Sequence, residues 1–165
     1  MEKAKNTLRE LIPYVVILLV VIVIKTFIFT PVIVNGKSMM NTLHDNDIMI
    51  LNKIGMKLEN PKRFDIVVIQ TDHSKIIKRV IALPGETIEY RDNKLYINGK
   101  ELKDSYGSDI TYDIDKITLG KDEYYVLGDN RTDSVDSRIL GPINKQDVLG
   151  YAKFIIYPLN RFGSK

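Results

Sequence analysis

A serine and a lysine are the residues of this chain whose types could together support nucleophilic chemistry. Ser38 lies in the short polar stretch "VNGKSMMNTL", which directly follows the most hydrophobic part of the sequence. A serine hydroxyl becomes an effective nucleophile only when a nearby base takes its proton. The chemistry in question is therefore acyl transfer at a serine, and the next question is which residue could act as the base.

Histidine, the usual base, has weak support in this sequence. His44 lies in a turn that enters a predicted strand, and His73 lies in the polar turn "QTDHSK". Neither context predicts burial or an orienting carboxylate. With two histidines and no cysteine, the chain also lacks the usual ligands of a catalytic zinc ion. We therefore expect no metal and no other cofactor.

Lysine is the alternative base, provided that its amine is buried. An exposed lysine has a pKa of about 10.4 and is charged at neutral pH, whereas burial in apolar surroundings can lower that pKa by several units. Lys78 lies within the hydrophobic run "KIIKRVIALPG", and in a strand it would share a face with Ile76 and Val80. The same pattern fits a solvated lysine that protects an edge strand from aggregation. Spacing alone favours this second interpretation.

The stretch before Ser38 predicts a membrane-spanning helix. Residues 11–29 read "LIPYVVILLVVIVIKTFIF", without a polar face at helical spacing from Val15 to Val23. As a helix this stretch would be roughly 28 Å long, close to the thickness of the bilayer hydrocarbon. A cleaved signal peptide would need small residues at its exit, and the chain has no alanine between Ala4 and Ala82. We therefore expect an uncleaved signal-anchor in the cell membrane.

Charge asymmetry predicts the orientation of this anchor. Lys3, Lys5 and Arg9 precede it, whereas Lys37 is the only lysine or arginine in the first fifteen or so residues after it. Basic residues gather on the cytoplasmic side of membrane helices. We expect a cytoplasmic amino terminus over residues 1–10, an extracytoplasmic domain over residues 32–160, and a short tail over residues 161–165.

The outer part of the chain predicts a mainly antiparallel β domain. Short alternating or β-branched runs are separated by turn residues, and Asn98-Gly99 in "LYINGKEL" predicts a two-residue hairpin. The polar segment 104–116, "DSYGSDITYDIDK", predicts a surface loop or an edge hairpin. The net charge of +3 is modest and its basic residues are dispersed, so we expect no nucleic-acid partner.

Four blocks of the sequence, in order, resemble those of bacterial type I signal peptidases of the short, single-span kind found in monoderm bacteria. The blocks are "GKSMMNTL", "DIMILNK" with "FDIVVI", "KRVIALPGE" and "GDNRTDSVDSR". The resemblance covers nearly the whole chain, and its last two blocks are highly specific. It implies a β fold similar to that of self-cleaving, LexA-like repressors. It also implies a membrane-bound serine endopeptidase that removes signal peptides from secretory preproteins at small-x-small sites. We expect this enzyme to contact the lipid bilayer and to be a monomer.

The resemblance also implies roles for individual residues. Ser38 would be the nucleophile and Lys78 the general base of a Ser/Lys dyad. Ser134 matches the serine that hydrogen-bonds the lysine amine and orients it. The other matched positions are the ion pair Asp136–Arg138, Asp129 in the same supporting loop, and the substrate-pocket residues Val32, Val34, Met39, Leu43, Ile76 and Ile77.

Two positions near the nucleophile depart from the family pattern. Asn41 replaces the usual proline, so we expect the loop after Ser38 to lose rigidity but to keep a turn-forming residue. Gly36 stands where part of the family has a serine that helps to bind the oxyanion, which leaves the second oxyanion donor open.

Other functions are compatible with parts of this pattern. An inactive relative could act as an accessory protein or chaperone in surface-protein or pilus assembly, but such a protein would be expected to lack Ser38 or Lys78. A self-cleaving repressor would carry a DNA-reading helical domain where the hydrophobic segment stands. A plain membrane-tethered β domain would explain the anchor but not the four blocks.

Overall fold

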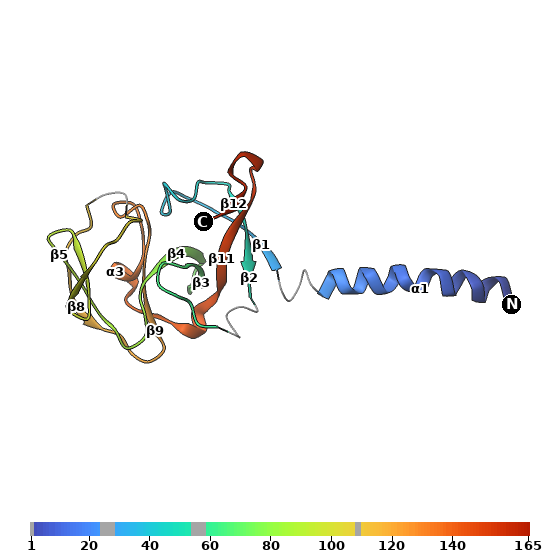
Figure 1. Cartoon of the computed structure of the whole chain (residues 1–165), viewed down its shortest axis with the longest axis horizontal. Coiled ribbons are helices and arrows are strands. Elements are labelled where there is room, and N and C mark those ends of the chain that lie inside the picture. Colours follow the sequence, from blue (N-terminus) through green and yellow to red (C-terminus); the bar gives the residue numbers. More distant parts are fainter. Residues whose placement is uncertain (1, 24–28, 54–58, 108–109) are drawn as a thin grey trace.

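A computed structural model describes residues 2–23, 29–53, 59–107 and 110–165 of the protein. One helix, α1 (Glu2–Val23), extends away from a β domain that contains the other elements (Figure 1). Among the described residues, no helix is both long and apolar enough to meet the requirements for crossing a membrane.

The boundaries of α1 differ from those of the anchor that we expected over residues 11–29. The helix already begins at Glu2, within the segment expected to be separate and cytoplasmic. Phe29, expected to end the anchor, is instead the first residue of strand β1 (Phe29–Ile33), where it pairs with Asn52. Sheet pairing of this aromatic and β-branched stretch therefore replaces helix by residue 29. Residues 24–28 lie outside the described part.

The larger sheet carries most of the β domain, and its pairings are antiparallel. Its strands follow the order β1-β2-β11-β3-β4-β9-β10, and β12 pairs with β11. After β1, the strands are β2 (Ile48–Asn52), β3 (Ile66–Gln70), β4 (Lys75–Ala82), β9 (Glu123–Leu127), β10 (Ile143–Asn144), β11 (Val148–Tyr157) and β12 (Gly163–Ser164). The expected mainly antiparallel β fold is confirmed.

A smaller sheet lies at the end of the β domain remote from α1 (Figure 1). Its order is β7-β6-β5-β8, formed by β5 (Thr87–Arg91), β6 (Lys94–Ile97), β7 (Lys100–Leu102) and β8 (Ile114–Thr118). The predicted hairpin at Asn98-Gly99 joins β6 to β7, with φ angles of 52° and 76° that suit a two-residue turn. Within the segment 104–116, the described residues 104–107 and 110–113 belong to no helix or strand, and Ile114 begins β8.

Three short helices complete the described elements. They are α3 (Ser137–Leu140), η2 (Lys145–Asp147) and η3 (Leu159–Arg161). The short tail expected over residues 161–165 includes the last residue of η3 and the strand β12. Ser164 pairs with Phe154, and the ring of Phe162 packs edge-on against that of Phe154 at 5.0 Å. These contacts fix the carboxyl terminus to β11.

Strand β4 is anchored on both faces because it contributes to every hydrophobic cluster of the β domain. Ile77 packs in the cluster under the turn that carries Ser38, Ile81 in the cluster between the two sheets, and Val80 in the third. Close packing on all sides leaves little freedom to a strand. A side chain carried by β4 is therefore held in a fixed position.

Candidate active site

Ser38 lies in a tight turn between β1 and β2. Met40 N donates to Lys37 O at 3.0 Å, and Leu43 N donates to Met39 O at 2.8 Å. The side chains of Met39 and Leu43 are buried in the core beneath the turn. Ser38 itself is half-buried, so its hydroxyl is held by buried neighbours while it stays accessible.

Lys78 reaches this hydroxyl from β4. Its Nζ lies 2.7 Å from Ser38 Oγ and donates to Ile77 O at 3.0 Å. The side chain is 3% exposed, so the interpretation as a solvated edge-strand lysine is wrong. β4 pairs with β3 along residues 75–79, but its pairing with β9 begins only at Arg79. Lys78 therefore stands where one edge of β4 becomes free.

The surroundings of Lys78 make its amine a usable base. Burial lowers the pKa of Lys78 to about 8, although the carboxylates of Asp136 and Asp129 act in the opposite direction. At pH 7 about a tenth of the amines would then be neutral, against less than one in a thousand for an ordinary lysine. A neutral amine at hydrogen-bond distance can accept the proton of the hydroxyl.

The loop after β9 supports the dyad through the expected ion pair of Asp136 and Arg138. Arg138 Nε and Nη2 each donate to one oxygen of the Asp136 carboxylate at 2.8 Å. Gly128 N donates to the same carboxylate at 2.9 Å. Burial favours the neutral acid, but these donors hold the pKa of Asp136 below its ordinary value. Asp136 is therefore a buried anion that fixes the loop.

Asp129 forms a second ion pair, with the residue that follows Lys78 in the chain. Arg79 Nε and Nη2 donate to its two oxygens at 2.8 and 2.6 Å, and Thr42 Oγ1 donates to it at 2.5 Å. Arg79 and Asp129 are both fully buried. This pair ties β4 to the nucleophile turn. Arg79 and Thr42 were not among the residues predicted to belong to the site, although an arginine within a hydrophobic strand was a signal for Arg79.

Ser134 lies close to the site, but its hydroxyl is not hydrogen-bonded to the Lys78 amine, whose partners are Ser38 and Ile77. It lies instead against Gly128. A Cβ built on Gly128 would come within 2.2 Å of Ser134 Oγ and 2.5 Å of Ser38 O. The orienting role of Ser134 stays a prediction, and Gly128 is a site residue that sequence reasoning missed.

The same loop holds the main chain of the nucleophile. Asn130 N donates to Ser38 O at 3.1 Å, and Asn130 Nδ2 donates to Lys37 O at 3.2 Å. Within the described part of the chain, the N–H of Ser38 itself donates to no acceptor. This N–H is therefore available to a developing oxyanion. Gly36 N is occupied, since it donates to Asp45 Oδ1 at 2.7 Å.

A groove of about 1430 Å³ leads away from the dyad between β1 and the free edge of β4. Five of the residues expected to form the substrate pocket line it, namely Val32, Val34, Met39, Ile76 and Ile77. Leu43 does not. Its side chain is fully buried in the core, because the turn from Met39 to Leu43 directs it beneath the nucleophile. Leu43 is a packing residue.

The two histidines lie apart from this arrangement. His73 is exposed in the turn between β3 and β4. His44 is also exposed, and its Nε2 lies 3.3 Å from Arg161 Nη1. Among the described contacts, the amine of Lys78 is the basic group next to Ser38.

Comparison with known proteins gives matches over most of the chain. Residues 8–157 match the family model described as signal peptidase, peptidase S26. Signal peptidase I P of Bacillus subtilis subsp. natto is 38% identical, over 97% of this chain and 94% of its own length. Signal peptidase I T of Bacillus subtilis (strain 168) is 38% identical, over 96% of this chain and 90% of its own length. The crystal structure of a signal peptidase I from Enterococcus faecalis V583, 36% identical, covers 56% of this chain and 97% of its own, with a TM-score of 0.51. The chain therefore belongs to the signal peptidase family, peptidase S26.

Proposed function

We propose that this protein removes amino-terminal signal peptides from secretory preproteins, with Ser38 as the nucleophile and Lys78 as the general base. The observation that carries the proposal is the 2.7 Å contact between Lys78 Nζ and Ser38 Oγ. In a member of the signal peptidase family, a buried amine beside an accessible serine is suited to hydrolysis of a peptide bond. An accessory protein without enzymatic activity would have no use for this pair.

The reaction uses the amine twice. Neutral Lys78 accepts the proton of Ser38 as the hydroxyl oxygen attacks the scissile carbonyl, and the N–H of Ser38 stabilises the oxyanion. The ammonium of Lys78, which also donates a hydrogen bond to Ile77 O, then protonates the departing amine. Neutral Lys78 next deprotonates a water molecule that attacks the acyl-enzyme, and the ammonium returns the proton to Ser38 Oγ as the ester bond breaks. The carboxylates of Asp136 and Asp129 stabilise the ammonium between these steps.

The groove suits an extended peptide with small side chains. Among the described strands, residues 75–78 of β4 pair with β3 and with no second strand, so their other edge can add a strand of substrate. Alternate side chains of an extended peptide face the same wall. The wall next to the dyad is formed by Val32, Met39 and Ile77. These apolar neighbours favour small residues at alternate positions before the cleaved bond and disfavour charged ones.

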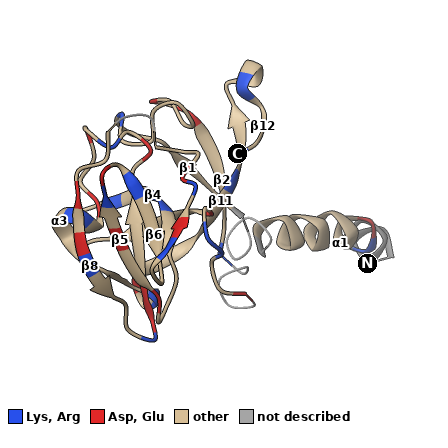
Figure 2. Cartoon of the chain, turned by 60° about the vertical axis from the view of Figure 1, so that its left-hand side comes forward, with Lys and Arg blue, Asp and Glu red and all other residues tan. Residues whose placement is uncertain are grey.

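The proposed membrane location is supported by the distribution of charge and apolar surface. The charged residues of α1 lie between Glu2 and Glu10, near its amino-terminal end (Figure 2). The large apolar side chains from Leu11 to Ile22 are half-exposed or more on every face. A helix that is apolar all round is suited to hydrocarbon. We place residues 1–10 in the cytoplasm, an anchor that begins at Leu11 and ends before strand β1, and a monomeric catalytic domain from residue 32 onward outside.

Cleavage of a preprotein by the detergent-solubilised full chain tests the proposal. We expect a new amino terminus at a small-x-small site, read by sequencing of the product. Ser38→Ala and Lys78→Ala should each lower the rate at least about a thousandfold. Ser164→Ala and Lys100→Ala change exposed residues elsewhere and serve as matched controls. Full activity of Lys78→Ala would reject the dyad, and binding of preproteins without cleavage would favour the accessory role.

The proposed orientation has its own test, because the chain contains no cysteine. Single cysteines are introduced as Lys5→Cys and Lys100→Cys, and intact cells are treated with a membrane-impermeant maleimide. We expect the second variant to be labelled from outside and the first only after lysis. The opposite labelling pattern would overturn the orientation.

A further inference from the structure

The polar stretch that follows β7 has contacts on both sides of the candidate active site. It carries Asp104, Tyr106 and Thr111, here called the brace residues. We propose that the brace residues position the Ser/Lys dyad through two buried arginines, Arg131 and Arg79. This inference rests on the proposed function and adds to it residues that never touch the substrate.

Arg131 carries the first of these connections. It is 2% exposed, its Nη2 donates to Asp104, and its Nη1 donates to Thr111 Oγ1 at 2.7 Å and to the hydroxyl of Tyr90 at 2.9 Å. On its other side, Arg131 Nε donates to Gly128 O at 2.9 Å. The smaller sheet and its loop therefore hold the carbonyl of the glycine that packs against Ser38.

Tyr106 carries the second connection. Its ring centre lies 3.7 Å from the guanidinium carbon of Arg79 and 5.1 Å from the ring centre of Phe64. Arg79 is 1% exposed, whereas Tyr106 is 39% exposed. The tyrosine thus covers the guanidinium that pairs with Asp129. A cation held over an aromatic face and shielded from water binds its carboxylate more strongly.

The two arginines lead to the two halves of the dyad. Arg131 fixes Gly128, next to which Asn130 N donates to Ser38 O. Arg79 is adjacent to Lys78 in β4 and donates to Asp129, which accepts from Thr42 of the nucleophile turn. Loss of a brace residue frees these supports and displaces the hydroxyl relative to the amine. Displacements of about 1 Å can cost up to roughly a hundredfold in rate.

The groove should not be affected by such a change. Neither the brace residues nor the two arginines are among the residues that line it. Substrate binding in the ground state therefore stays as it was, and the loss falls on the chemical step. A positioning role predicts a lower kcat with an unchanged KM.

Steady-state cleavage of a preprotein peptide by the full chain in detergent tests the proposal. Tyr106→Ala and Asp104→Asn should each lower kcat about tenfold, with KM within about twofold of the wild type. Tyr106→Phe should recover most of the loss because it keeps the ring. Tyr112→Ala and Asp115→Asn are the matched controls, since both residues are exposed in the same part of the chain.

The alternative outcomes are distinct. If kcat per folded molecule stays within twofold of the wild type in both test variants, the proposal is rejected. If kcat falls as much in Tyr106→Phe as in Tyr106→Ala, the proposed role of the Tyr106 ring is rejected. Should Tyr106→Ala not fold, Tyr106→Leu and Thr111→Val, which keep similar bulk, take its place under the same criteria. A wild type that cleaves no preprotein would instead overturn the proposed function.

Discussion

Gly128 packs so closely against Ser38 that a Cβ atom at Gly128 would lie 2.5 Å from the Ser38 carbonyl oxygen. This partner is backbone and cannot rotate away, so Gly128→Ala must move the nucleophile turn. We expect kcat for preprotein cleavage to fall by about a hundredfold or more. Gly120→Ala is the control, because its Cβ would meet only the flexible side chain of Glu123. Equal activity of the two variants would contradict the close packing.

The pH dependence of the reaction should report the amine of Lys78. Burial lowers the pKa of Lys78 to about 8, and only the neutral amine accepts a proton. We expect kcat/KM to rise about tenfold per pH unit below this pKa and to level off above it. Because Asp136 raises this pKa, Asp136→Asn should shift the acid limb to lower pH. An unchanged profile in that variant would show that Asp136 does not influence the pKa of Lys78.

The lowered pKa of Lys78 should also cost stability. The pKa in the folded protein is about 8, against 10.5 for the unfolded chain, so the folded state binds the proton less tightly. The penalty is fully present below pH 8 and disappears as pH rises through 10.5. The difference corresponds to roughly 3 kcal/mol. We expect Lys78→Met to unfold at a higher temperature than the wild type at pH 7, with the gap closing near pH 10.5. A gap that is independent of pH would contradict this origin.

Local sequence signals predicted the features that depend on neighbouring residues. The turn at Asn98-Gly99 and the strand that carries Lys78 were both predicted correctly. Each depends on residues no more than a few positions apart. Alternation within one strand was enough to select Lys78 as a candidate, although it could not tell burial from exposure.

Features that depend on distant segments were not predictable in this way. The closeness of Gly128 to Ser38 arises only when the loop after β9 meets the nucleophile turn, 90 residues away along the chain. Leu43 was expected in the pocket because it matches a pocket position of the family, but the turn directs it into the core. Hydrophobic periodicity describes one segment at a time and contains no information on contacts between segments that are far apart along the chain.

The loop after the nucleophile should reject the proline that is usual in the family. Asn41 has a φ of 77°, whereas the proline ring fixes φ near about −65°. Asparagine tolerates the left-handed region, so it specifies this turn instead of merely loosening it. We expect Asn41→Gly to keep the wild-type kcat and Asn41→Pro to lose most of it, with a lower melting temperature. Full activity of Asn41→Pro would show that the turn can adopt another backbone conformation at residue 41.

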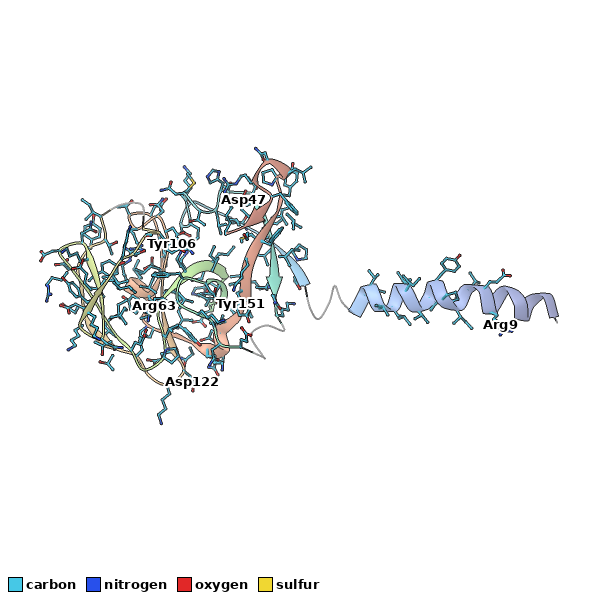
Figure 3. The ribbon with its side chains drawn as sticks, viewed as in Figure 1. Arg9, Asp47, Arg63, Tyr106, Asp122 and Tyr151 are labelled. Carbon is cyan, nitrogen blue, oxygen red and sulfur yellow. The ribbon has the colours of Figure 1, made fainter. Side chains whose placement is uncertain are left out.

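The carboxyl-terminal arginine should stabilise the loop that carries the nucleophile. Arg161 Nε and Nη2 both lie 3.0 Å from oxygens of Asp47, and Nη2 also donates to Thr42 O at 3.0 Å. Asp47 is 1% exposed and lies on the side of the β domain toward η3 (Figure 3). Its carboxylate would therefore remain buried without a counter-ion if the arginine were removed.

Arg161→Gln should consequently lower the free energy of unfolding by roughly 2–3 kcal/mol, less than for a fully buried pair because Arg161 is partly exposed. Denaturant unfolding of the full chain measures the loss. Lys165→Gln, a charge removal at the exposed end of the same segment, is the matched control. Adding Asp47→Asn to Arg161→Gln removes the stranded charge, so the double variant should regain part of the stability. If the double variant is instead less stable by the sum of the two single losses, the two side chains contribute independently and do not form a coupled pair.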